Sequence, residues 1–423
     1  MKRLLSLLLC LVLTASLAAA EAPTEFTDFA GQHRYVAAAD AATTSATVKT
    51  FIDGDTTHFY VPEDVIPGGV IKARYLAVNT PEITGKVEEW GKKAAAFTRE
   101  KLSSAQAILL QSDNGTWNFD STSERHLVWV WYLPEGENAY RLLNLELLQE
   151  GLSKANATAN NRYGGVCQQA LNQAKALKKN LYSGQKDPDF YYGEAIELTL
   201  RELRTHLQAY NGMKVAFHGV VTFNAGQAVY VEAFDPETGR TYGMSVYYGH
   251  GLSGQGLDIL SVGNEVRIVG TLQYYEAGGT WQVSGLTYRP MRPTDPGNIQ
   301  KISSGHSPAF TPYTAEALLT GQAEIDGNSY SLAELTVATT VAVEDLAVQS
   351  AYASDDGSMT LTCNSGDVTL TVRTEPLYEN GALVTPARYE GKTIAVQGVV
   401  DVYDFGCQVR VLLSDHITII NGR

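Results

Sequence analysis

Acidic and basic side chains interrupt the apolar segments near the start of the chain. The stretch FIDGDTTHFY at 51–60 carries Asp53 and Asp55 inside a strand-like run, and ARYLAVNTPE at 73–82 adds an arginine and a second acidic turn. Strand interiors disfavour Asp and Gly, because neither residue fits a pleated, half-buried surface. The two aspartates therefore suggest chemistry rather than packing.

These charged groups match the requirements of a phosphodiester. Asp55 follows a glycine and Glu82 follows a proline, so turns at strand ends can aim both carboxylates at one place. Arg74 precedes the second turn, and Arg125 begins the later strand RHLVWVWY. Oxygen ligands hold a hard cation, guanidinium groups bind phosphoryl oxygens, and a carboxylate orients a water. The combination indicates phosphoryl-transfer chemistry.

The segments around these residues predict a small barrel wrapped by helices. Alternation and Gly, Pro and Asp turns predict strands, and helix formers with apolar residues at helical spacing predict helices. The strands are expected at 46–53, 57–62, 70–78, 107–113 and 126–136, and the helices at 87–105, 139–151 and 166–184. The loop PEDVIPGG is expected to lie beside the site.

The rest of the chain has a different pattern. After the Tyr-rich joint DPDFYYG come a short helix at 195–209, five strands, a Pro-, Gly- and Ser-rich connector at 290–312, and a second series of strands. The two series share a motif, GNEVRIVG in one and GKTIAVQG in the other. This repetition suggests two OB-type barrels, although the glycines also suit bends in any small antiparallel barrel.

The N-terminal motifs resemble those of a known family. VKTFIDGDT, ARYLAVNTPE, EEWGKKAAAFT, the Arg125 strand and LLQEGLSKA occur in the order and approximate spacing of the staphylococcal nuclease (thermonuclease) family, over residues 44–184. The resemblance implies an OB-type barrel with three helices. It also implies calcium-dependent hydrolysis of phosphodiester bonds of DNA and RNA, with release of 3′-phosphate ends.

The resemblance assigns a calcium site. Asp55 is the expected carboxylate ligand, and Thr80 offers its backbone carbonyl. Asp53 is expected to contact the ligands without binding the metal itself. Asn79 stands where the family has a second aspartate ligand, so one negative charge is missing. An amide oxygen can still bind calcium, and a weaker metal affinity is expected.

The resemblance also assigns the catalytic groups. Glu82 is expected to orient or deprotonate the attacking water, Arg74 to bridge the scissile phosphate, and Arg125 to stabilise the departing oxygen. The alternative is that Asp55 and Asn79 only cap turns while the arginines form surface ion pairs.

A second departure from the family concerns substrate contacts. The family presents tyrosines after its GLAK-like segment, whereas GLSKANATANNRYGG has Ala157 and Ala159 near those places and Tyr163 further on. Contacts with the nucleotide are therefore expected to be rearranged.

Together these patterns predict a chain that is mainly β with some α. An OB-type five-stranded barrel with three helices is followed by two OB-like β-barrels. The expected divisions are a signal peptide at 1–20, a disordered lead-in at 21–43, the nuclease-like domain at 44–185, one barrel at 193–290, a linker at 291–312 and a second barrel at 313–423.

The N-terminus predicts export. Lys2 and Arg3 precede an apolar run that ends in small residues before Glu21, which is typical of a secretory signal. No later stretch is apolar enough to span a membrane. Cys10 lacks the preceding small residues of a lipid-attachment site. The mature chain is expected to be secreted, at the cell surface or periplasmic.

Three cysteines remain after the signal, an odd number for an oxidising compartment. Cys363 and Cys407 lie in strand-like segments of one region and either form a disulfide or act as two small buried hydrophobes. The histidines have no ligand spacing, so no zinc site is expected.

Charge is spread unevenly. Residues 44–185 contain 15 Lys and Arg against 15 Asp and Glu, whereas residues 186–423 contain 14 against 27. A polyanion should avoid the acidic half, so truncation after about residue 186 is expected to leave cleavage intact.

The role of the acidic half stays open. Its aromatic residues suit either a core or stacking on single strands, and an unknown protein or carbohydrate partner or a structural spacer fits its charge equally well. The alternative to an enzyme is a catalytically weak nuclease-like fold that binds nucleic acid or carbohydrate.

Overall fold

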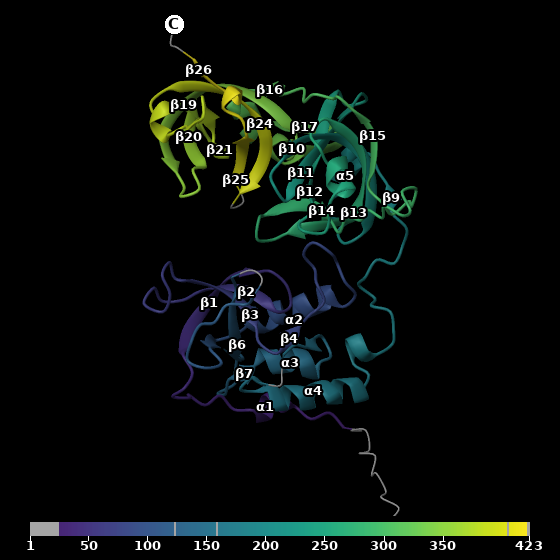
Figure 1. Ribbon diagram of the computed structural model, residues 1–423, viewed down its shortest axis with the longest axis vertical. Helices are drawn as coiled ribbons and strands as arrows, with labels where there is room; N and C mark the ends of the chain where they lie inside the picture. The colour runs from purple at the N-terminus through teal and green to yellow at the C-terminus, as the bar shows by residue number, and fades with distance from the viewer. Residues whose placement is uncertain (1–24, 122–123, 158–159, 404–405, 421–423) are drawn as a thin grey trace, which may run out of the picture.

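The computed structural model describes residues 25–121, 124–157, 160–403 and 406–420 (Figure 1). The expected signal peptide lies outside the described residues. Within the described part of the chain, no helix is long and apolar enough to cross a membrane. Figure 1 shows the N-terminal domain below and two barrels side by side above it.

The N-terminal domain is a closed ring of five strands. The strands are β1 (Thr43–Phe51), β2 (Thr56–Tyr60), β3 (Val70–Tyr75), β5 (Ala107–Gln111) and β6 (His126–Leu133), and β7 (Arg141–Leu142) extends the sheet. β3 pairs with β6 in parallel and closes the ring. Every strand expected from the sequence is present. The 61–69 loop, however, lies at the end of the β2–β3 hairpin opposite Arg74, because Thr56 pairs with Arg74 and Tyr60 with Val70.

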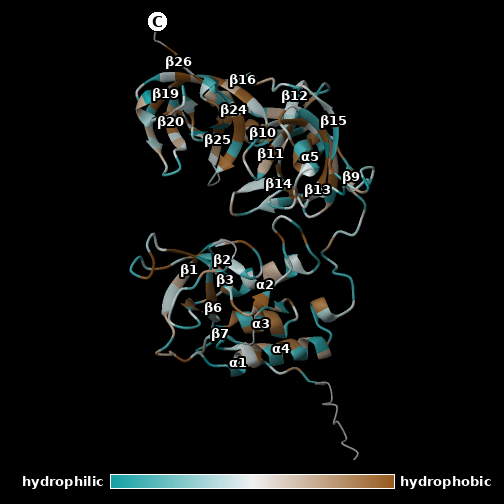
Figure 2. Ribbon diagram, in the orientation of Figure 1, coloured by the Kyte–Doolittle hydropathy of each residue, from teal (hydrophilic) through white to brown (hydrophobic). Residues whose placement is uncertain are grey.

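Three helices complete this domain, as expected. They are α2 (Gly91–Ser103), α3 (Leu143–Gln149) and α4 (Gly164–Ala176). All residues of α3 are buried, so this helix is the centre of the helical layer. The segment that follows it, which includes Ser153, is thereby placed next to the barrel. Apolar residues gather inside the ring and under the helices (Figure 2).

The lead-in before β1 is more ordered than its composition predicts. Residues 29–32 form the short helix α1 (Phe29–Gln32), and Ala30 is fully buried. Arg141 donates two hydrogen bonds of 2.9 Å to the carboxylate of Asp28, and Gln149 donates another of 3.1 Å. The expectation of disorder at 21–43 is therefore wrong for the described part of this segment, because long-range polar contacts hold it.

The C-terminal half contains two more closed rings of five strands. The first comprises β10 (Lys214–Asn224), β11 (Ala228–Asp235), β12 (Arg240–Tyr247), β13 (Asn264–Tyr275) and β14 (Thr280–Ser284). The second comprises β19 (Thr340–Ala353), β20 (Met359–Ser365), β21 (Val368–Thr374), β24 (Thr393–Tyr403) and β25 (Gly406–Val411). In all three rings the third and fifth strands run parallel. This shared strand order confirms the expected succession of OB-type barrels.

The repeated glycine motifs have one physical cause. Each motif lies at the start of the fourth strand of its ring, β13 or β24. A Cβ at Gly270 would lie 2.6 Å from the carbonyl oxygen of Ser284. A Cβ at Gly398 would likewise overlap the carbonyl oxygen of Arg410. Only glycine lets the fifth strand approach this closely.

Short elements surround these rings. The helices are α5 (Leu200–Thr205), α6 (Gln255–Ile259), α7 (Ala315–Thr320) and α8 (Leu332–Leu335). The remaining strands are β4 (Val78–Asn79), β8 (Lys154–Ala155), β9 (Ile196–Glu197), β15 (Gln300–Ser304), β16 (Thr311–Tyr313), β17 (Gln322–Ile325), β18 (Asn328–Ser331), β22 (Tyr378–Glu379), β23 (Ala382–Leu383) and β26 (Ile417–Ile420).

The connector between the two C-terminal barrels is structured. β15 pairs with β13 and β16 pairs with β19, so the expected linker at 291–312 contributes a strand to each barrel. The β17–β18 hairpin and α8 belong by sequence to the second barrel but place Ala323, Ile325, Leu332 and Leu335 in the core of the first. The packing boundary therefore differs from the boundary expected at residue 313.

Buried polar contacts join the two C-terminal barrels. Arg204 of α5 donates to the carbonyls of Gly243 at 3.1 Å and Val337 at 3.0 Å, and burial lowers its pKa to about 10. Glu232 accepts hydrogen bonds of 2.6 and 2.8 Å from the backbone N–H and hydroxyl of Thr340. These contacts link residues of different rings, so the two barrels form one barrel pair.

The Tyr-rich joint packs on the N-terminal domain. Asp187 is 2 % exposed and its Oδ2 accepts a 2.5 Å hydrogen bond from the backbone N–H of Trp90, at the start of α2. The hydroxyl of Tyr192 donates to Glu89 at 2.6 Å and accepts from the backbone N–H of Asp187 at 2.9 Å. A truncation after residue 186 would remove these contacts, and a boundary after residue 193 would retain them.

The cysteines of the described chain are free thiols. Cys363 is buried and Cys407 is partly buried. Burial raises the pKa of Cys363 to about 12 and that of Cys407 to about 11. Of the two alternatives left by the sequence, the structure supports small buried hydrophobes.

Candidate active site

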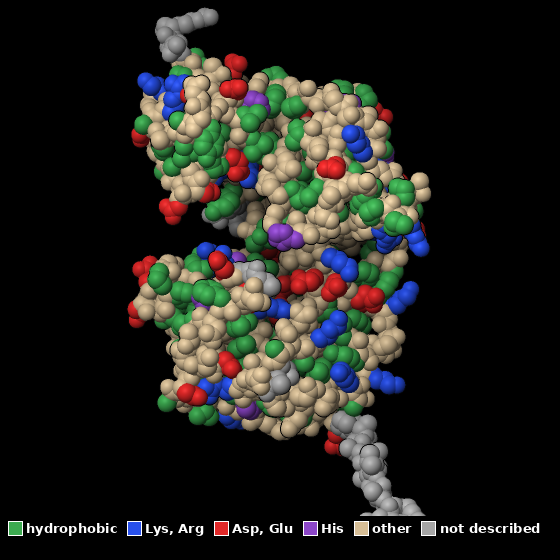
Figure 3. Space-filling model, viewed as in Figure 1, with side chains coloured by type: hydrophobic (Ala, Val, Ile, Leu, Met, Phe, Trp, Pro, Cys, Tyr) green, Lys and Arg blue, Asp and Glu red, His purple; other side chains and the backbone are tan. Residues whose placement is uncertain are grey.

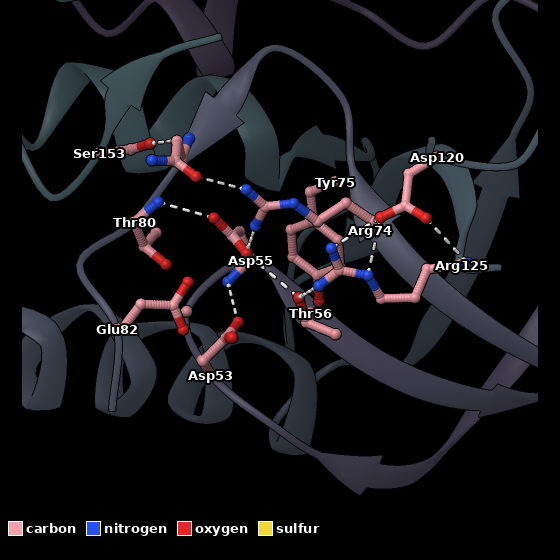
Figure 4. Close-up of polar contacts among 12 residues, drawn as sticks. Asp53, Asp55, Thr56, Arg74, Tyr75, Thr80, Glu82, Asp120, Arg125 and Ser153 are labelled. Atoms are coloured by element: carbon pink, nitrogen blue, oxygen red, sulfur yellow. Dashed lines mark hydrogen bonds and ion pairs between the residues drawn. The ribbon is translucent and has the colours of Figure 1, made fainter. Parts of the chain in front are cut away.

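The residues selected from the sequence meet at one edge of the first barrel (Figure 4). Asp53 and Asp55 lie in the turn between β1 and β2, and Arg74 lies on β3. Asn79 follows on β4, and Thr80 and Glu82 lie in the loop that leads to α2. The closed ring brings these segments together, because β2 pairs with β3 over residues 56–60 and 70–74.

The turn before β2 aims Asp55 inward. Oδ1 of Asp53 accepts a 3.0 Å hydrogen bond from the backbone N–H of Asp55, and so fixes the turn. Asp55 is 1 % exposed. A Cβ at Gly54 would lie 2.9 Å from the side chain of Thr80. Glycine at this position therefore lets the two segments pack closely.

The carboxylate of Asp55 is fully engaged. Its Oδ2 accepts a 2.6 Å hydrogen bond from the backbone N–H of Thr80, and its Oδ1 accepts one of 3.2 Å from the hydroxyl of Thr56. Oδ1 is also ion-paired with Nη1 of Arg74. Nη2 of the same guanidinium donates a 2.5 Å hydrogen bond to Oδ1 of Asn79. Arg74 thus joins both of the side chains expected to bind calcium.

The position of Asn79 is set from the far side of the site. Its backbone N–H donates a 2.8 Å hydrogen bond to Oγ of the buried Ser153, and β4 pairs with β8. Ser153 follows α3 in the segment GLSKA. This contact explains in physical terms why that segment accompanies the acidic turns.

The loop that carries Glu82 is pinned to the start of α2. The backbone N–H of Glu88 donates a 2.9 Å hydrogen bond to the carbonyl of Glu82, and the N–H of Glu82 donates one of 3.3 Å to the carboxylate of Glu88. Glu82 keeps an exposed surface, yet neighbouring protein atoms displace water from its carboxylate. This loss of hydration, together with the charge of Asp53, raises the pKa of Glu82, while Arg74 opposes the shift.

The two carboxyl groups of this site therefore influence each other. Burial also raises the pKa of Asp53, against the lowering effect of Arg74. If the ionised form of Glu82 acts as a base, the acidic limb of the profile of kcat/KM against pH should lie above the usual range for a glutamate.

Substituting Asp53→Asn tests this coupling. The amide keeps an oxygen that can accept from the backbone of Asp55 but removes the negative charge that raises the pKa of Glu82. We expect the acidic limb to move to lower pH, as measured by kcat/KM across a pH series. The solvent-exposed Glu100→Gln serves as a control. An acidic limb that stays in place would contradict the assigned coupling.

Arg125 is positioned by a residue that the sequence did not indicate. Its Nε and Nη2 donate to Oδ2 of Asp120 at 2.9 and 2.6 Å, and its Nη1 lies 3.4 Å from the hydroxyl of Thr56. Asp120 precedes Arg125 by five positions in the loop before β6, a spacing that no motif rule identifies. Arg125 itself lies just before β6, and because Thr56 directly follows Asp55, this contact places the guanidinium beside the Asp55 turn.

The expected substrate contacts after α3 are not formed by Tyr163. Its hydroxyl donates a 2.8 Å hydrogen bond to Gln111, and its ring packs edge-on against Trp129 and Trp131. Tyr163 therefore belongs to the domain interior. Ala157 is exposed, and Ala159 lies outside the described residues.

The oxygens of this site suit a cation. Those of Asp55 and Asn79 already converge on a positive group, the guanidinium of Arg74. Within the described residues, the hydroxyl of Thr80 is buried without a hydrogen-bond partner. No group of three or more His, Cys, Asp or Glu in the described chain is arranged to hold a metal. The donor set thus fits a hard cation held by one carboxylate and neutral oxygens, which predicts modest affinity.

Comparison with known proteins agrees with the first domain. Residues 72–184 match the family model described as Staphylococcal nuclease homologue. The chain therefore contains a domain of this family. The match includes Arg74, Glu82 and Arg125, whereas Asp53 and Asp55 precede it and are linked to it by the contacts above. No curated protein matches the chain.

Proposed function

We propose that this chain is an exported, calcium-dependent nuclease that hydrolyses phosphodiester bonds of DNA and RNA and leaves 3′-phosphate ends. The observation that carries the proposal is the convergence of Asp55, Arg74, Asn79 and Glu82 at one edge of a domain of nuclease type. The meeting of these four residues, each selected from the sequence, in one site argues against isolated turn caps and surface ion pairs.

The residues of the site have complementary roles in this reaction. Glu82 takes a proton from the attacking water, whose oxygen bonds to phosphorus as the bond to the 5′ oxygen breaks. Arg74 binds the phosphoryl oxygens, and Arg125 stabilises the charge that develops on the departing oxygen. Asp120 holds Arg125 in place through two N–H groups. The 5′ oxygen leaves as an alkoxide, with its charge stabilised by Arg125, and takes a proton from a solvent water. Glu82 returns its proton to solvent, and the phosphate stays on the 3′ side.

Calcium would be held by the carboxylate of Asp55, the amide oxygen of Asn79 and the carbonyl of Thr80, and when bound it supplies positive charge beside the phosphate. Because Arg74 contacts the same oxygens of Asp55 and Asn79, the guanidinium must exchange these partners for phosphate oxygens. Asp53 keeps the turn of Asp55 in place.

The central experiment measures degradation of nucleic acid by the purified mature protein. Plasmid DNA, single-stranded DNA and RNA are incubated with calcium or with a chelator over neutral to alkaline pH. We expect calcium-dependent cleavage, and products that a polymerase extends only after removal of the 3′ phosphate. Absence of metal-dependent cleavage on every substrate would refute the enzyme and leave the binding module.

The binding module is the second candidate. Its supporting observation is the engagement of Asp55 and Asn79 by Arg74, with no larger cluster of metal-binding side chains among the residues described. A protein of this kind would retain nucleic acid in chelator and calcium alike without degrading it.

Substituting Asn79→Asp tests the assigned metal site. A second carboxylate restores negative charge to a site that otherwise has Asp55 and neutral oxygens, so half-maximal activity should need less calcium. Activity is measured over a calcium titration with wild type in parallel. An unchanged calcium requirement would remove Asn79 from the ligands. A higher requirement would mean that the new carboxylate strengthens the ion pair with Arg74 instead.

Export and the roles of the second C-terminal barrel also remain proposals. Fusion of residues 1–20 to a reporter tests whether this segment directs secretion. For the second barrel, an unknown protein or carbohydrate remains the proposed partner.

A further inference from the structure

The barrel pair lies directly against the candidate active site. Gln273 of β13 is buried and donates a 2.7 Å hydrogen bond to the carbonyl of Ile83, next to Glu82. Arg99 of α2 forms an ion pair with Glu276. Figure 3 shows a hollow between the two halves of the molecule, with acidic side chains on the nuclease side and a histidine on the barrel side.

Two adjoining cavities occupy this boundary. One has a volume of about 320 Å³ and is lined by Asp53 of the site. The other has a volume of about 700 Å³, within the range of small-ligand sites. Both are lined by Ile52, Thr84, Tyr275 and Gln282. The larger cavity therefore continues from the catalytic edge into the first C-terminal barrel.

Aromatic residues form the barrel side of the larger cavity. Tyr247 and Tyr248 end β12 and begin the loop after it, and Tyr275 ends β13. Burial raises the pKa of Tyr275, and the nearby Tyr247 adds to this effect. The hydroxyl of Tyr248 donates a 2.5 Å hydrogen bond to the carbonyl of Gly226. Tyr248 packs in part against the barrel core, whereas Tyr247 and Tyr275 stand at the ends of β12 and β13, at the mouth of the barrel.

The cavity occupies the loops with which OB-type barrels bind ligands. Gln227 lies in the loop between the first and second strands of the ring, and Tyr275 begins the loop between the fourth and fifth. Oligonucleotides and oligosaccharides bind OB-type barrels through these two loops. On the opposite wall, Gly85 approaches Tyr247, since a Cβ there would lie 3.8 Å from the ring.

The charge of this cavity differs from that of the half to which it belongs. Among the described residues that line it, none is Asp or Glu, and Lys86 and His250 are its basic residues. Lys86 forms a solvent-exposed 3.5 Å ion pair with Glu88, which exchange with a phosphate can replace. Glu276, the carboxylate that the barrel contributes to the described lining of the smaller cavity, is paired with Arg99. The excess of acidic residues over 186–423 therefore does not extend to this surface.

We propose that the cavity between the two halves binds unpaired bases of a single-stranded DNA or RNA next to the cleaved phosphodiester, with Tyr247 and Tyr275 as stacking platforms. Every base has a face that stacks on an aromatic ring, and the phosphates pass Lys86 and His250. The barrel thereby supplies the base contacts that Tyr163, packed inside the first domain, does not make. This inference rests on the proposed nuclease function and names the strand that the site selects.

The shape of the cavity predicts a preference for unpaired strands over duplexes. A base reaches the tyrosines only when it is out of a duplex stack, so unpaired strands should bind more tightly than duplexes. The charge-based expectation that residues 186–423 stand outside the substrate path is replaced by this assignment. Truncation of the barrel pair, even after residue 193, should weaken binding of single strands.

The test uses full-length protein with Tyr247→Ala and Tyr275→Ala combined. Binding of a fluorescein-labelled thymidine 12-mer is measured by anisotropy in chelator, and kcat/KM is measured on the same oligomer and on bis(p-nitrophenyl) phosphate. We expect Kd to rise about 10-fold or more, and the ratio of kcat/KM for the oligomer to that for the small diester to fall. Tyr352→Ala, at an exposed position on the second barrel, should leave both measurements unchanged.

Two further variants, with opposite charges at one exposed position, keep the test decisive if the tyrosine variant misfolds. His250 is exposed at the cavity rim, so His250→Glu and His250→Lys should both fold, as melting curves will show. We expect weaker oligomer binding for the glutamate and equal or tighter binding for the lysine.

The possible outcomes separate the two proposals. Equal oligomer binding by wild type, the tyrosine variant and both His250 variants would overturn the base-binding inference. The 12-mer annealed to its complement is measured in the same way, and a loss of duplex binding as large as the loss of single-strand binding would overturn the selectivity. If wild type cleaves neither substrate but binds the oligomer in a tyrosine-dependent manner, the nuclease proposal fails and the base-binding inference stands.

Discussion

Glu82→Gln should abolish most turnover while leaving the fold intact. A positioned general base contributes about 10²- to 10⁴-fold to rate, and we expect a loss of kcat of that size. The side chain has an exposed surface, and the loop is held through backbone contacts with Glu88. Removing the charge of Glu82 should therefore have little effect on the free energy of unfolding.

The measurement pairs calcium-dependent cleavage of single-stranded DNA with thermal melting. Glu100→Gln is the matched control, since its side chain is solvent-exposed on α2. A melting temperature that falls in proportion to activity would favour a structural role for Glu82. Wild-type activity in the glutamine variant would remove it from the reaction.

Arg74→Met should affect activity and stability in different ways. Loss of one preorganised donor to the phosphoryl group should lower kcat about 10²- to 10³-fold. In chelator, the variant also leaves the buried carboxylate of Asp55 without its cation. Breaking a buried ion pair costs about 3–5 kcal/mol, and the remaining hydrogen bonds from Thr80 and Thr56 should keep the loss at the lower end.

Calcium distinguishes the two effects of this substitution. A cation bound at Asp55 replaces the lost charge, so calcium should raise the melting temperature of the Arg74→Met variant more than that of wild type. Kinetics should not recover, because the phosphate contact is still missing. Arg388→Met is the control, at an exposed ion pair of 3.7 Å with Glu379. Equal melting of wild type and variant in chelator would contradict the assigned burial of the pair.

Much of the site was predictable because short motifs fix it. Asp55, Arg74 and Glu82 occupy turns and strands whose order along the chain sets their meeting point in a closed ring. Asp120 was not predictable, since its partner depends on how a loop folds back on β6. Tyr163 illustrates the converse, because sequence cannot tell a tyrosine that faces the interior from one that faces a ligand.

The three barrels were predictable from strand alternation and glycine repeats, whereas their limits were not. The hairpin at 322–331 follows the first barrel in sequence yet supplies side chains to its core. Composition also misled at the N-terminus, where Asp28 and Ala30 are fixed by Arg141 and Gln149, more than a hundred positions away. Total charge likewise gave no indication that the described residues lining the larger cavity between the two halves include no Asp or Glu.

The docking of Asp187 and Tyr192 on the start of α2 limits how far the two halves can separate. If binding of a strand breaks the contacts of Gln273 with Ile83 and of Arg99 with Glu276, the short segment between the joint and β9 still tethers the barrel. A short tether keeps the released surface at an effective concentration in the millimolar range. Under the proposed function, such a tether would let the protein open around a long polymer at an internal position and close again without losing its second half. We therefore expect cleavage within chains rather than attack at their ends, which the length distribution of early products on a long single strand would show.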